Sequence, residues 1–528
     1  YKWCRISGEA HRLYAEKKSY TEDEGEREDG LYSSGEGEIT RRNSMDRKLN
    51  LEPKVVFGFF EKIASIPHGS YNTKEISDYL VDFAKERGLE YYQDEVNNVV
   101  ISKPASPGYE NADPVMIQGH IDMVCEQTPG SDIDMTKDGL DLYVDGDWLR
   151  AKDTTLGGDD GIAVAMALAV LDSKEYKHPK LDCVFTVDEE VGLLGAVALD
   201  ASKIEARKMI NIDSEEEGII TVSCAGGVSA KAVIPVSREK AKGIVANISV
   251  NGLLGGHSGI EIDKEHGNAN ILMGRILYDL AQVVEYKLVK ADGGSKDNAI
   301  CKKTDAEIVI AAADADKLKT EIKRAEDILA HELKAVDPDI KVSVELGEEQ
   351  EVSVLDDKSK TKVITWLINT PYGIQHMSKE IEGLVETSLN LGALNTLEDK
   401  MTAFYAVRSA VDSRRKHLCS KLDNLAKTLG GTVEYSGEYP GWQYRADSAL
   451  REVCVEVYKA QYGKKPKVEA IHAGLECGLF AGKMDDGRFD AVSIGPDMEG
   501  VHTTDEKLSI SSVGRTWKYL LGILEACK

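Results

Sequence analysis

The stretch Pro114-Val-Met-Ile-Gln-Gly-His120-Ile-Asp122-Met-Val-Cys-Glu126 indicates which class of fold this chain adopts. Its short apolar run, Val115 to Ile117, predicts a buried strand, and the glycine that follows allows a sharp turn. His120 and Asp122 therefore lie just past the carboxyl end of a strand, where open α/β sheets place their ligands. A carboxylate beside an imidazole orients the ring for metal binding. Alone, such a pair is more often a hydrogen-bonded core histidine than a metal site.

A second informative stretch, Thr154-Thr-Leu-Gly157-Gly158-Asp159-Asp160-Gly161, precedes an apolar helix. Paired glycines let the backbone approach a ligand closely. One aspartate at a helix start is usually only a cap. Two adjacent aspartates behind glycines suggest that at least one of them faces a cation.

Three more apolar strands end in the same kinds of residue. Residues 184–187 run into Asp188-Glu189-Glu190, residues 209–212 end in Asp213, and residues 491–494 precede His502. Adjacent carboxylates repel one another unless a positive charge neutralises them. The alternative, a solvated acidic turn, explains one such strand end but not the whole set. The pattern therefore predicts a carboxylate-bridged pair of metal ions on an α/β sheet.

Composition limits the class of protein. The chain has 528 residues and a formal charge of −26, so we expect two or three domains and neither nucleic acid nor an anionic membrane as partner. Its nine cysteines are scattered, without C-x-x-C spacing, which is typical of reduced thiols in the cytosol. The longest apolar run, residues 162–171, is too short to span a bilayer. We therefore expect a cytoplasmic protein.

The expected fold is an α/β catalytic domain with an insertion. Residues 1–44 have few aliphatic side chains and predict a disordered or artefactual extension. Residues 45–228 and 438–528 would form the catalytic domain, with a central, mostly parallel sheet and helices on both faces. The insertion, residues 229–437, would be an α+β domain that serves as a lid and for dimerisation. Its sequence predicts strands at 244–250, 298–302, 307–312 and 341–345, with helices at 268–284 and 315–336. This order is ferredoxin-like. Residues 358–435 are interpreted as a second, related subdomain.

Taken together, these motifs resemble the M20 metallopeptidase family, and within it subfamily C, the aminoacyl-histidine dipeptidases. The resemblance extends from about residue 47 to the C-terminus. The sequence departs from the family pattern at two places: Asp160 stands where Asn is expected, and Thr503-Thr504 stand where Ser-Pro is more usual. The matching stretches are 65–71, 119–124, 154–157, 255–259, 267–270, 385–392, 408–413 and, most diagnostic of the subfamily, 471–480.

The resemblance implies two Zn²⁺ ions per subunit, with Mn²⁺ or Co²⁺ as substitutes, which suits mixed imidazole and carboxylate ligands. His120, Asp159 and Asp213 would hold one ion; Asp159, Glu190 and His502 would hold the other. Glu189 would be the general base and acid, and Asp122 would support His120.

The inserted domain also carries residues of the family site. The resemblance implies that His257 stabilises the oxyanion across the interface of a homodimer and that Arg408 binds the substrate carboxylate. Glu476 and Asn268 belong to matching motifs and are candidate substrate-binding residues, although no role follows from the sequence.

The implied activity is hydrolysis of Xaa-His dipeptides, of the carnosine type, and of other dipeptides. An alternative is another amidohydrolase of the family, a tripeptidase or an N-acyl-amino-acid deacylase. A third hypothesis is a non-catalytic metal-binding protein. Glu189 argues against the third, because retaining a metal requires no second carboxylate beside Glu190.

Overall fold

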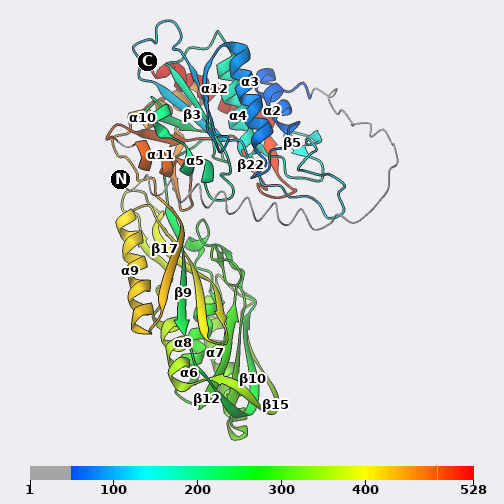
Figure 1. Ribbon diagram of the computed structural model, residues 1–528, viewed down its shortest axis with the longest axis vertical. Coiled ribbons are helices and arrows are strands. Elements are labelled where there is room, and N and C mark those ends of the chain that lie inside the picture. Colours follow the sequence, from blue (N-terminus) through cyan, green and yellow to red (C-terminus); the bar gives the residue numbers. More distant parts are fainter. Residues whose placement is uncertain (1–48, 485) are drawn as a thin grey trace. The chain divides into compact units, whose positions relative to one another are not determined.

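The computed structural model describes residues 49–484 and 486–528, and the expected extension 1–44 lies outside this part of the chain (Figure 1). The described residues form two compact units. Unit 1 comprises the described residues up to Val222 together with Tyr444–Glu469 and Leu475–Lys528. Unit 2 comprises Ser223–Gln443 and the short segment Ala470–Gly474.

Unit 1 is built on an eight-stranded sheet in the order β1-β2-β6-β3-β7-β21-β8-β20. Its four central strands, β6, β3, β7 and β21, are mutually parallel, whereas β1, β2 and β8 pair antiparallel towards the ends. The predicted parallel centre is therefore confirmed. The strands span Glu90–Gln93 (β1), Val99–Lys103 (β2), Val115–His120 (β3), Leu181–Thr186 (β6), Lys208–Asn211 (β7), Ile219–Cys224 (β8), Lys467–Ile471 (β20) and Asp490–Ser493 (β21).

Helices cover both faces of this sheet, as predicted. Gly119 of β3 faces helix α4, because a Cβ atom there would lie 2.6 Å from the Cβ of Ala163. Its neighbour Gln118 points to the other face and bonds Glu476, the first residue of helix α11. The helices of unit 1 are α2 (Lys54–Ala64), α3 (Lys74–Arg87), α4 (Gly158–Asp172), α5 (Leu194–Ala198), α10 (Ala449–Tyr462), α11 (Glu476–Met484) and α12 (Ile510–Ala526).

A small antiparallel sheet lies in unit 1 beside the large one. Its order is β22-β23-β5-β4, with strands Met498–Glu499, Lys507–Ser509, Trp148–Ala151 and Leu142–Asp145. β22 and β23 flank the loop that carries His502. This sheet therefore anchors both ends of that loop.

Unit 2 contains two β-α-β-β-α-β halves that share one antiparallel sheet. In the sheet order β15-β10-β14-β12-β17-β18-β9-β19, each half has the strand order of a ferredoxin-like unit, and the halves join through β12 and β17. The first half is β10 (Arg238–Asn251), α6 (Ala269–Leu280), β12 (Tyr286–Gly293), β14 (Thr304–Ile310), α7 (Ala315–Leu333) and β15 (Lys341–Leu355). The second is β9 (Gly226–Pro235), α8 (Asp357–Asn369), β17 (Val385–Thr396), β18 (Lys400–Ser409), α9 (Asp412–Thr428) and β19 (Thr432–Tyr439), with β16 (Gly373–Met377) on β17.

One strand of the first half was predicted at the wrong place. Residues 298–302 do not form its second strand; they contain β13 (Ala299–Ile300), which pairs with β11 (Gly256–His257). The second strand is β12, in which Tyr286 and Leu288 are buried and Lys287 lies between them. The predicted helix continued to residue 284, so it left little room for a strand that begins at Tyr286.

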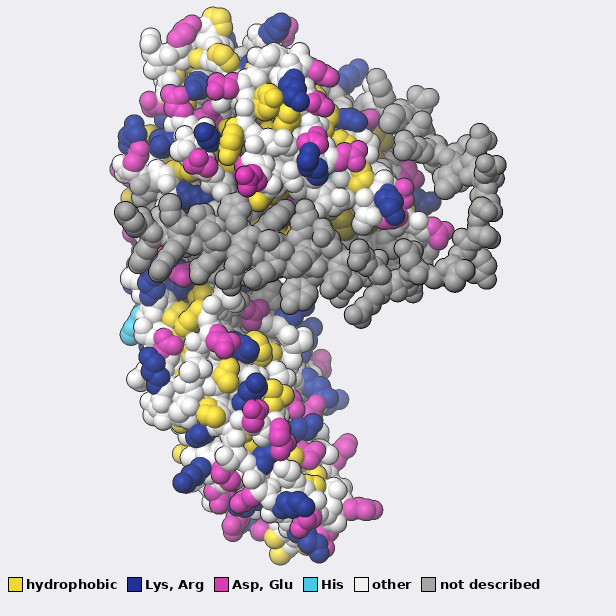
Figure 2. Space-filling view, in the orientation of Figure 1, with side chains coloured by type: hydrophobic (Ala, Val, Ile, Leu, Met, Phe, Trp, Pro, Cys, Tyr) yellow, Lys and Arg dark blue, Asp and Glu magenta, His cyan; other side chains and the backbone are white. Residues whose placement is uncertain are grey.

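The helices of unit 2 pack on one face of its sheet. Ile248, Leu288, Ile308 and Val407 from the strands share a continuous apolar core with Trp366 of α8. The exposed surface of both units carries interspersed acidic and basic side chains in the view of Figure 2, without a field of one sign. Among the described helices, none combines the length and the apolar character that crossing a membrane requires.

Candidate metal centre

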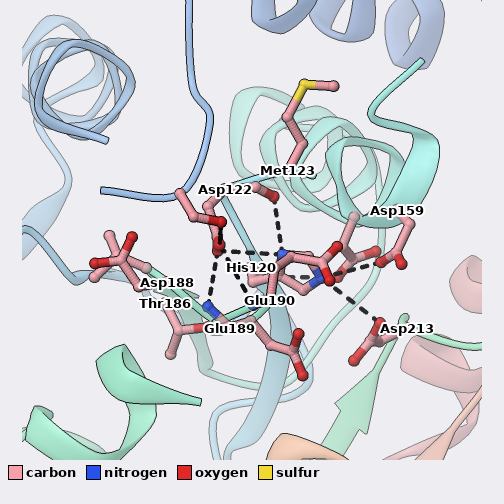
Figure 3. Close-up of polar contacts among 12 residues, drawn as sticks. His120, Asp122, Met123, Asp159, Thr186, Asp188, Glu189, Glu190 and Asp213 are labelled. Carbon is pink, nitrogen blue, oxygen red and sulfur yellow. Dashed lines mark hydrogen bonds and ion pairs between the residues drawn. The ribbon is translucent and has the colours of Figure 1, made fainter. Parts of the chain in front are cut away.

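The carboxyl ends of three adjacent strands bring the predicted ligands together. β3 ends in His120, the loop after β6 carries Glu189 and Glu190, and the chain after β7 carries Asp213 (Figure 3). Parallel strands end at the same edge of a sheet, so these side chains converge although they are far apart in the sequence. Atoms of His120, Asp159 and Glu190 lie within 4.8 Å of one another, which is the spacing of ligands around one ion.

Asp159 lies between the two histidines. Its Oδ1 is 3.0 Å from Nε2 of His120, and its Oδ2 is 3.2 Å from Nε2 of His502. Glu190 lies 2.9 Å from the same nitrogen of His502, and Asp213 lies 3.8 Å from Nε2 of His120. Each histidine therefore has one carboxylate of its own and shares Asp159. The bridging role that the family resemblance implies for Asp159 stays a prediction.

Asp160 occupies a different place from Asp159. Its Oδ2 accepts a hydrogen bond of 3.2 Å from the backbone N–H of His120, and its side chain is fully buried. It also lies within 4.8 Å of ligand atoms of His120 and Asp213, so geometry admits it as a ligand. However, an oxygen of Asp160 already bonds the backbone of β3, whereas Asp159 presents one oxygen to each histidine.

Asp122 connects the strand end that carries His120 to the acidic loop after β6. Its carboxylate accepts hydrogen bonds from the backbone N–H groups of Glu189, at 3.0 Å, and Glu190, at 3.4 Å. Ser70 donates to it at 2.8 Å, and Nδ1 of His120 lies 3.4 Å away. Because the loop and the imidazole share this carboxylate, Asp122 fixes the orientation of His120 relative to both glutamates.

Burial and neighbouring charged groups shift the pKa values of the side chains in this cluster. Burial lowers the pKa of His120, but hydrogen bonds to Asp122 and Asp159 outweigh burial and hold that pKa well above its usual value. Hydrogen bonds to Asp159 and Glu190 raise the pKa of His502 to about 11. Burial and neighbouring carboxylates hold the pKa of Asp213 well above its usual range. Without a cation, protons held by the two histidines and by Asp213 offset the negative charge of the cluster.

The donor set fits a pair of divalent cations. Imidazole and carboxylate ligands suit Zn²⁺, Mn²⁺ or Co²⁺. Mutually repelling carboxylates with raised pKa values become stable anions when metal charge is present. The side chains that would hold the ions are His120, Asp159, Glu190, Asp213 and His502.

Glu189 lies beside this cluster without an ion pair to either histidine in the described part of the chain. Burial raises its pKa well above the usual value, and Asp213, Glu476 and Glu190 raise it further, against the opposing effect of His120. A carboxylate with a raised pKa next to a metal site suits proton transfer at neutral pH.

Glu476 lies on the same face of the sheet as the metal cluster, at the level of Gln118, which is two residues before His120 in β3. Its Oε2 accepts a bond of 2.6 Å from Thr186 and another from Gln118, and no part of its side chain is exposed. Burial raises the pKa of Glu476 to about 7. The side chain is thus part of a buried polar layer, and its substrate-binding role stays a prediction.

A second polar cluster lies in unit 2. Nη2 of Arg408 is 3.5 Å from Nε2 of His257, and Nη1 donates to the hydroxyl of Tyr439 at 3.1 Å. His472 lies in the same cluster, 2.8 Å from the hydroxyl of Ser388. Arg408 is buried, its Nε has no hydrogen-bond partner, and no carboxylate pairs with its guanidinium within residues 49–484 and 486–528. A buried arginine without an acidic partner suits the binding of an anionic group.

Both histidines of this cluster are held neutral. Burial, followed by the nearby charge of Arg408, lowers the pKa of His257 and lowers that of His472 to about 3. The cluster therefore carries the single positive charge of Arg408. A carboxylate of a small substrate would neutralise it.

Asn268 has a structural position. Its Oδ1 accepts from the backbone N–H groups of Asn270, at 3.0 Å, and Ile271, at 3.4 Å, so it caps α6. Its Nδ2 donates to Asn390 and to the carbonyl of Leu391. With both groups engaged and the side chain buried, the structure gives Asn268 no free group for substrate.

Two supporting residues did not emerge from the sequence. Ser70 belongs to a matching stretch but received no role, and it bonds Asp122. Glu506 lies four residues past His502, and its carboxylate accepts from the backbone of the Gly157-Gly158 turn. The sequence does show an acidic residue close to the predicted ligand His502. It does not reveal that this residue is buried or which backbone groups it contacts.

Known proteins are similar to this chain in sequence and in fold. The cytosol non-specific dipeptidase of Escherichia coli (strain K12) is 38% identical over 483 residues, which cover 91% of this chain and 99% of that protein. The crystal structure of aminoacylhistidine dipeptidase from Vibrio alginolyticus is 39% identical, with a TM-score of 0.84, over 90% of this chain and 97% of that one. The aminopeptidase PepT of Bacillus cereus, at 17% identity and a TM-score of 0.52 over 90% of this chain and 99% of that one, shares the fold.

The profile of Peptidase family M20/M25/M40 matches residues 116–526. This range contains all five side chains of the proposed metal cluster. The chain belongs to peptidase family M20/M25/M40.

Proposed function

We propose that the protein is a two-metal dipeptidase that hydrolyses Xaa-His dipeptides, such as β-alanyl-histidine, and other dipeptides. The observation that carries the proposal is the position of Asp159, with one carboxylate oxygen towards each histidine. The names of the two relatives with 38% and 39% identity support the substrate class. The name of the Escherichia coli relative supports a cytosolic location.

When bound, two Zn²⁺ ions would polarise the scissile carbonyl and lower the pKa of a water molecule. Glu189 would accept the proton of the attacking water on its carboxylate and deliver it to the leaving amine. Asp122 holds the backbone of Glu189 in place through the bond of 3.0 Å. This division of labour explains why two glutamates stand side by side: Glu190 binds metal, and Glu189 stays available for the proton.

His257 and Arg408 would act on the substrate itself. The Arg408 guanidinium, which lacks an acidic partner among the described residues, would bind the carboxylate of the dipeptide. The neutral imidazole of His257 would donate a hydrogen bond to the oxyanion that forms at the scissile carbonyl. We propose that the His257 of a homodimer partner performs this role, as the family resemblance implies.

The proposal is tested by the hydrolysis of β-alanyl-histidine with zinc-loaded protein. Glu189→Ala should lower kcat by a factor of about 10²–10⁴, because proton transfer is lost. Its zinc content should stay at the wild-type value. Glu175→Ala, an exposed glutamate after α4, is the matched control and should behave as wild type.

The substrate panel separates the alternatives. Tripeptides and N-acyl amino acids, measured beside dipeptides, distinguish a tripeptidase or a deacylase from a dipeptidase. Zinc binding without hydrolysis of any of these compounds would contradict the proposed activity and favour a binding protein.

A further inference from the structure

We propose that Glu506 is a positioning residue of the metal centre. Its carboxylate ties the loop that carries His502 to the turn that carries Asp159, and so sets the distance between two ligands from opposite parts of the chain. The inference rests on the proposed metal centre. It adds a residue that contacts neither substrate nor metal.

The first half of the tie is a set of three hydrogen bonds. The buried carboxylate of Glu506 accepts from three consecutive backbone N–H groups, those of Leu156 at 2.8 Å, Gly157 at 3.2 Å and Gly158 at 2.8 Å. The next residue in the chain is Asp159. Three bonds to one rigid carboxylate leave the peptide planes before Asp159 little freedom to rotate.

Glycine at position 158 allows this close approach. A Cβ atom there would lie 3.3 Å from Oε1 of Glu506 and 3.2 Å from Sδ of Met498. A side chain at 158 would therefore press on the carboxylate that holds the turn. The paired glycines of the sequence thus accommodate a protein carboxylate.

The second half of the tie is the turn between His502 and Glu506. Thr503 donates to the carbonyl of Gly500 from its backbone N–H, at 3.1 Å, and from its hydroxyl, at 2.6 Å. The N–H of Glu506 in turn donates to the carbonyl of Thr503 at 3.1 Å. These bonds make residues 500–506 a compact turn, so a restraint on Glu506 also restrains His502.

His502 needs such a restraint. Its φ is +63°, in the left-handed region that side-chain-bearing residues rarely adopt. Half of its side chain is exposed, so packing alone does not hold the ring. Its imidazole nevertheless points at Asp159 Oδ2 at 3.2 Å. The bonds of Glu506 account for how an exposed, strained loop presents its histidine to that carboxylate.

The test compares Glu506→Gln with Asp505→Asn. A glutamine has one acceptor oxygen, and its NH₂ group would face an N–H of the turn, so at least one of the three bonds is lost. We expect Zn²⁺ affinity, measured by competition with a chromophoric chelator, to fall by about 10–100-fold. Asp505, whose side chain is 90% exposed and pairs with Arg150 on the surface, is the neighbouring control and should keep wild-type affinity.

Melting temperatures without and with Zn²⁺ separate positioning from general support. A merely structural role would lower both melting temperatures of Glu506→Gln equally and leave the rise caused by Zn²⁺ unchanged, which would overturn the proposal. A smaller rise than in wild type supports it.

A second variant covers the case in which Glu506→Gln does not fold. Gly158→Ala keeps the side chain of Glu506 but places a Cβ atom 3.3 Å from its Oε1, tighter than most Cβ contacts, and should therefore also weaken Zn²⁺ binding; wild-type affinity in this variant would overturn the proposal. If wild-type protein itself binds no Zn²⁺, the proposed metal centre fails.

Discussion

At the scale of single residues, the two neighbouring aspartates of the glycine-rich loop have different surroundings. Asp159 faces both histidines, and bonds to them outweigh burial and lower its pKa, so it is the anion of the cluster. Burial, and then the charge of Asp213, holds the pKa of Asp160 well above its usual value. Asp159 is thus the carboxylate suited to bind cations. Asp160 is a buried acid that bonds the backbone at the end of β3.

This difference predicts unequal effects of two matched variants. Asp159→Asn should deplete both metal sites, because the bridging carboxylate is shared, with a loss of affinity of at least about 10–100-fold. Asp160→Asn should retain more metal. Zinc content per subunit after dialysis decides between them, and equal depletion would show that Asp160 also contributes a ligand.

The pKa of His472 predicts how acid affects the stability of the protein. In the folded state this pKa is lowered to about 3, so between about pH 3 and 6.5 the unfolded chain binds a proton that the folded chain excludes. Stability should therefore fall as the pH drops below about 6.5, with His472 contributing at most about 1.4 kcal/mol per pH unit.

The measurement is urea unfolding at pH 6.5, 5.5 and 4.5. His472→Gln should lose less stability on acidification than wild type, because the excluded proton is gone. His331→Gln, on the exposed side of α7, is the control. Parallel pH profiles for wild type and His472→Gln would contradict the prediction.

At the scale of elements, helix α8 is bonded to strand β18 through a buried polar contact in the core of unit 2. Nε1 of Trp366 donates to the hydroxyl of Tyr405 at 2.8 Å, and that hydroxyl lies 2.7 Å from the hydroxyl of Thr370. All three side chains are buried. Such a contact specifies which part of the helix lies on which part of the strand, which apolar packing alone leaves less sharply defined.

Tyr405→Phe should therefore destabilise unit 2. The variant leaves the N–H of Trp366 without an acceptor in the core, at a cost of about 1–3 kcal/mol of unfolding free energy. Tyr435→Phe is the matched control, because that hydroxyl bonds the carbonyl of Cys419 at the surface and should cost less than about 0.5 kcal/mol. Denaturant unfolding followed by tryptophan fluorescence reports the difference, and equal values for the two variants would contradict it.

At the scale of the whole molecule, the chain distributes its chemistry over two units. Unit 1 carries the proposed metal ligands and Glu189, whereas His257 and Arg408 belong to unit 2. The proposed roles therefore draw on residues of both units for turnover and on residues of unit 1 alone for metal binding.

Subunit mixing tests the proposed homodimer. His257→Ala should lose turnover by a factor of about 10²–10³ and keep its metals, as expected for an oxyanion donor. Mixing it with Glu189→Ala chains should restore activity, because one site of the heterodimer regains both residues. If the subunits exchange and no activity returns, each chain uses its own His257.

Residues 1–44 are predicted to be dispensable. They lie outside the described residues, and their few aliphatic side chains offer little apolar surface to bury. A chain that begins at Met45 should match the melting temperature and the kcat/KM of the full sequence. A clear loss of either would show that the segment contributes to the folded protein.

The sequence by itself determined the α/β class, the parallel centre of the sheet, the inserted domain and the family. These follow from local signals: apolar strands that end in His, Asp or Glu, glycines before an acidic helix start, and short motifs such as Gly-His-Ile-Asp. The convergence of the ligands was also predictable, because neighbouring parallel strands end at one edge.

Only the tertiary structure decided which groups of different segments meet. The bond of Glu506 to the Gly157-Gly158 turn, the contact of Ser388 with His472 and the bond of Asn268 to the carbonyl of Leu391 each join residues far apart in the chain. The strand β12, through which the halves of unit 2 join, was misplaced because the predicted helix continued to residue 284 and left little room for it. Hydrogen bonds to backbone groups are almost independent of the partner's side chain, so the sequence carries little record of them.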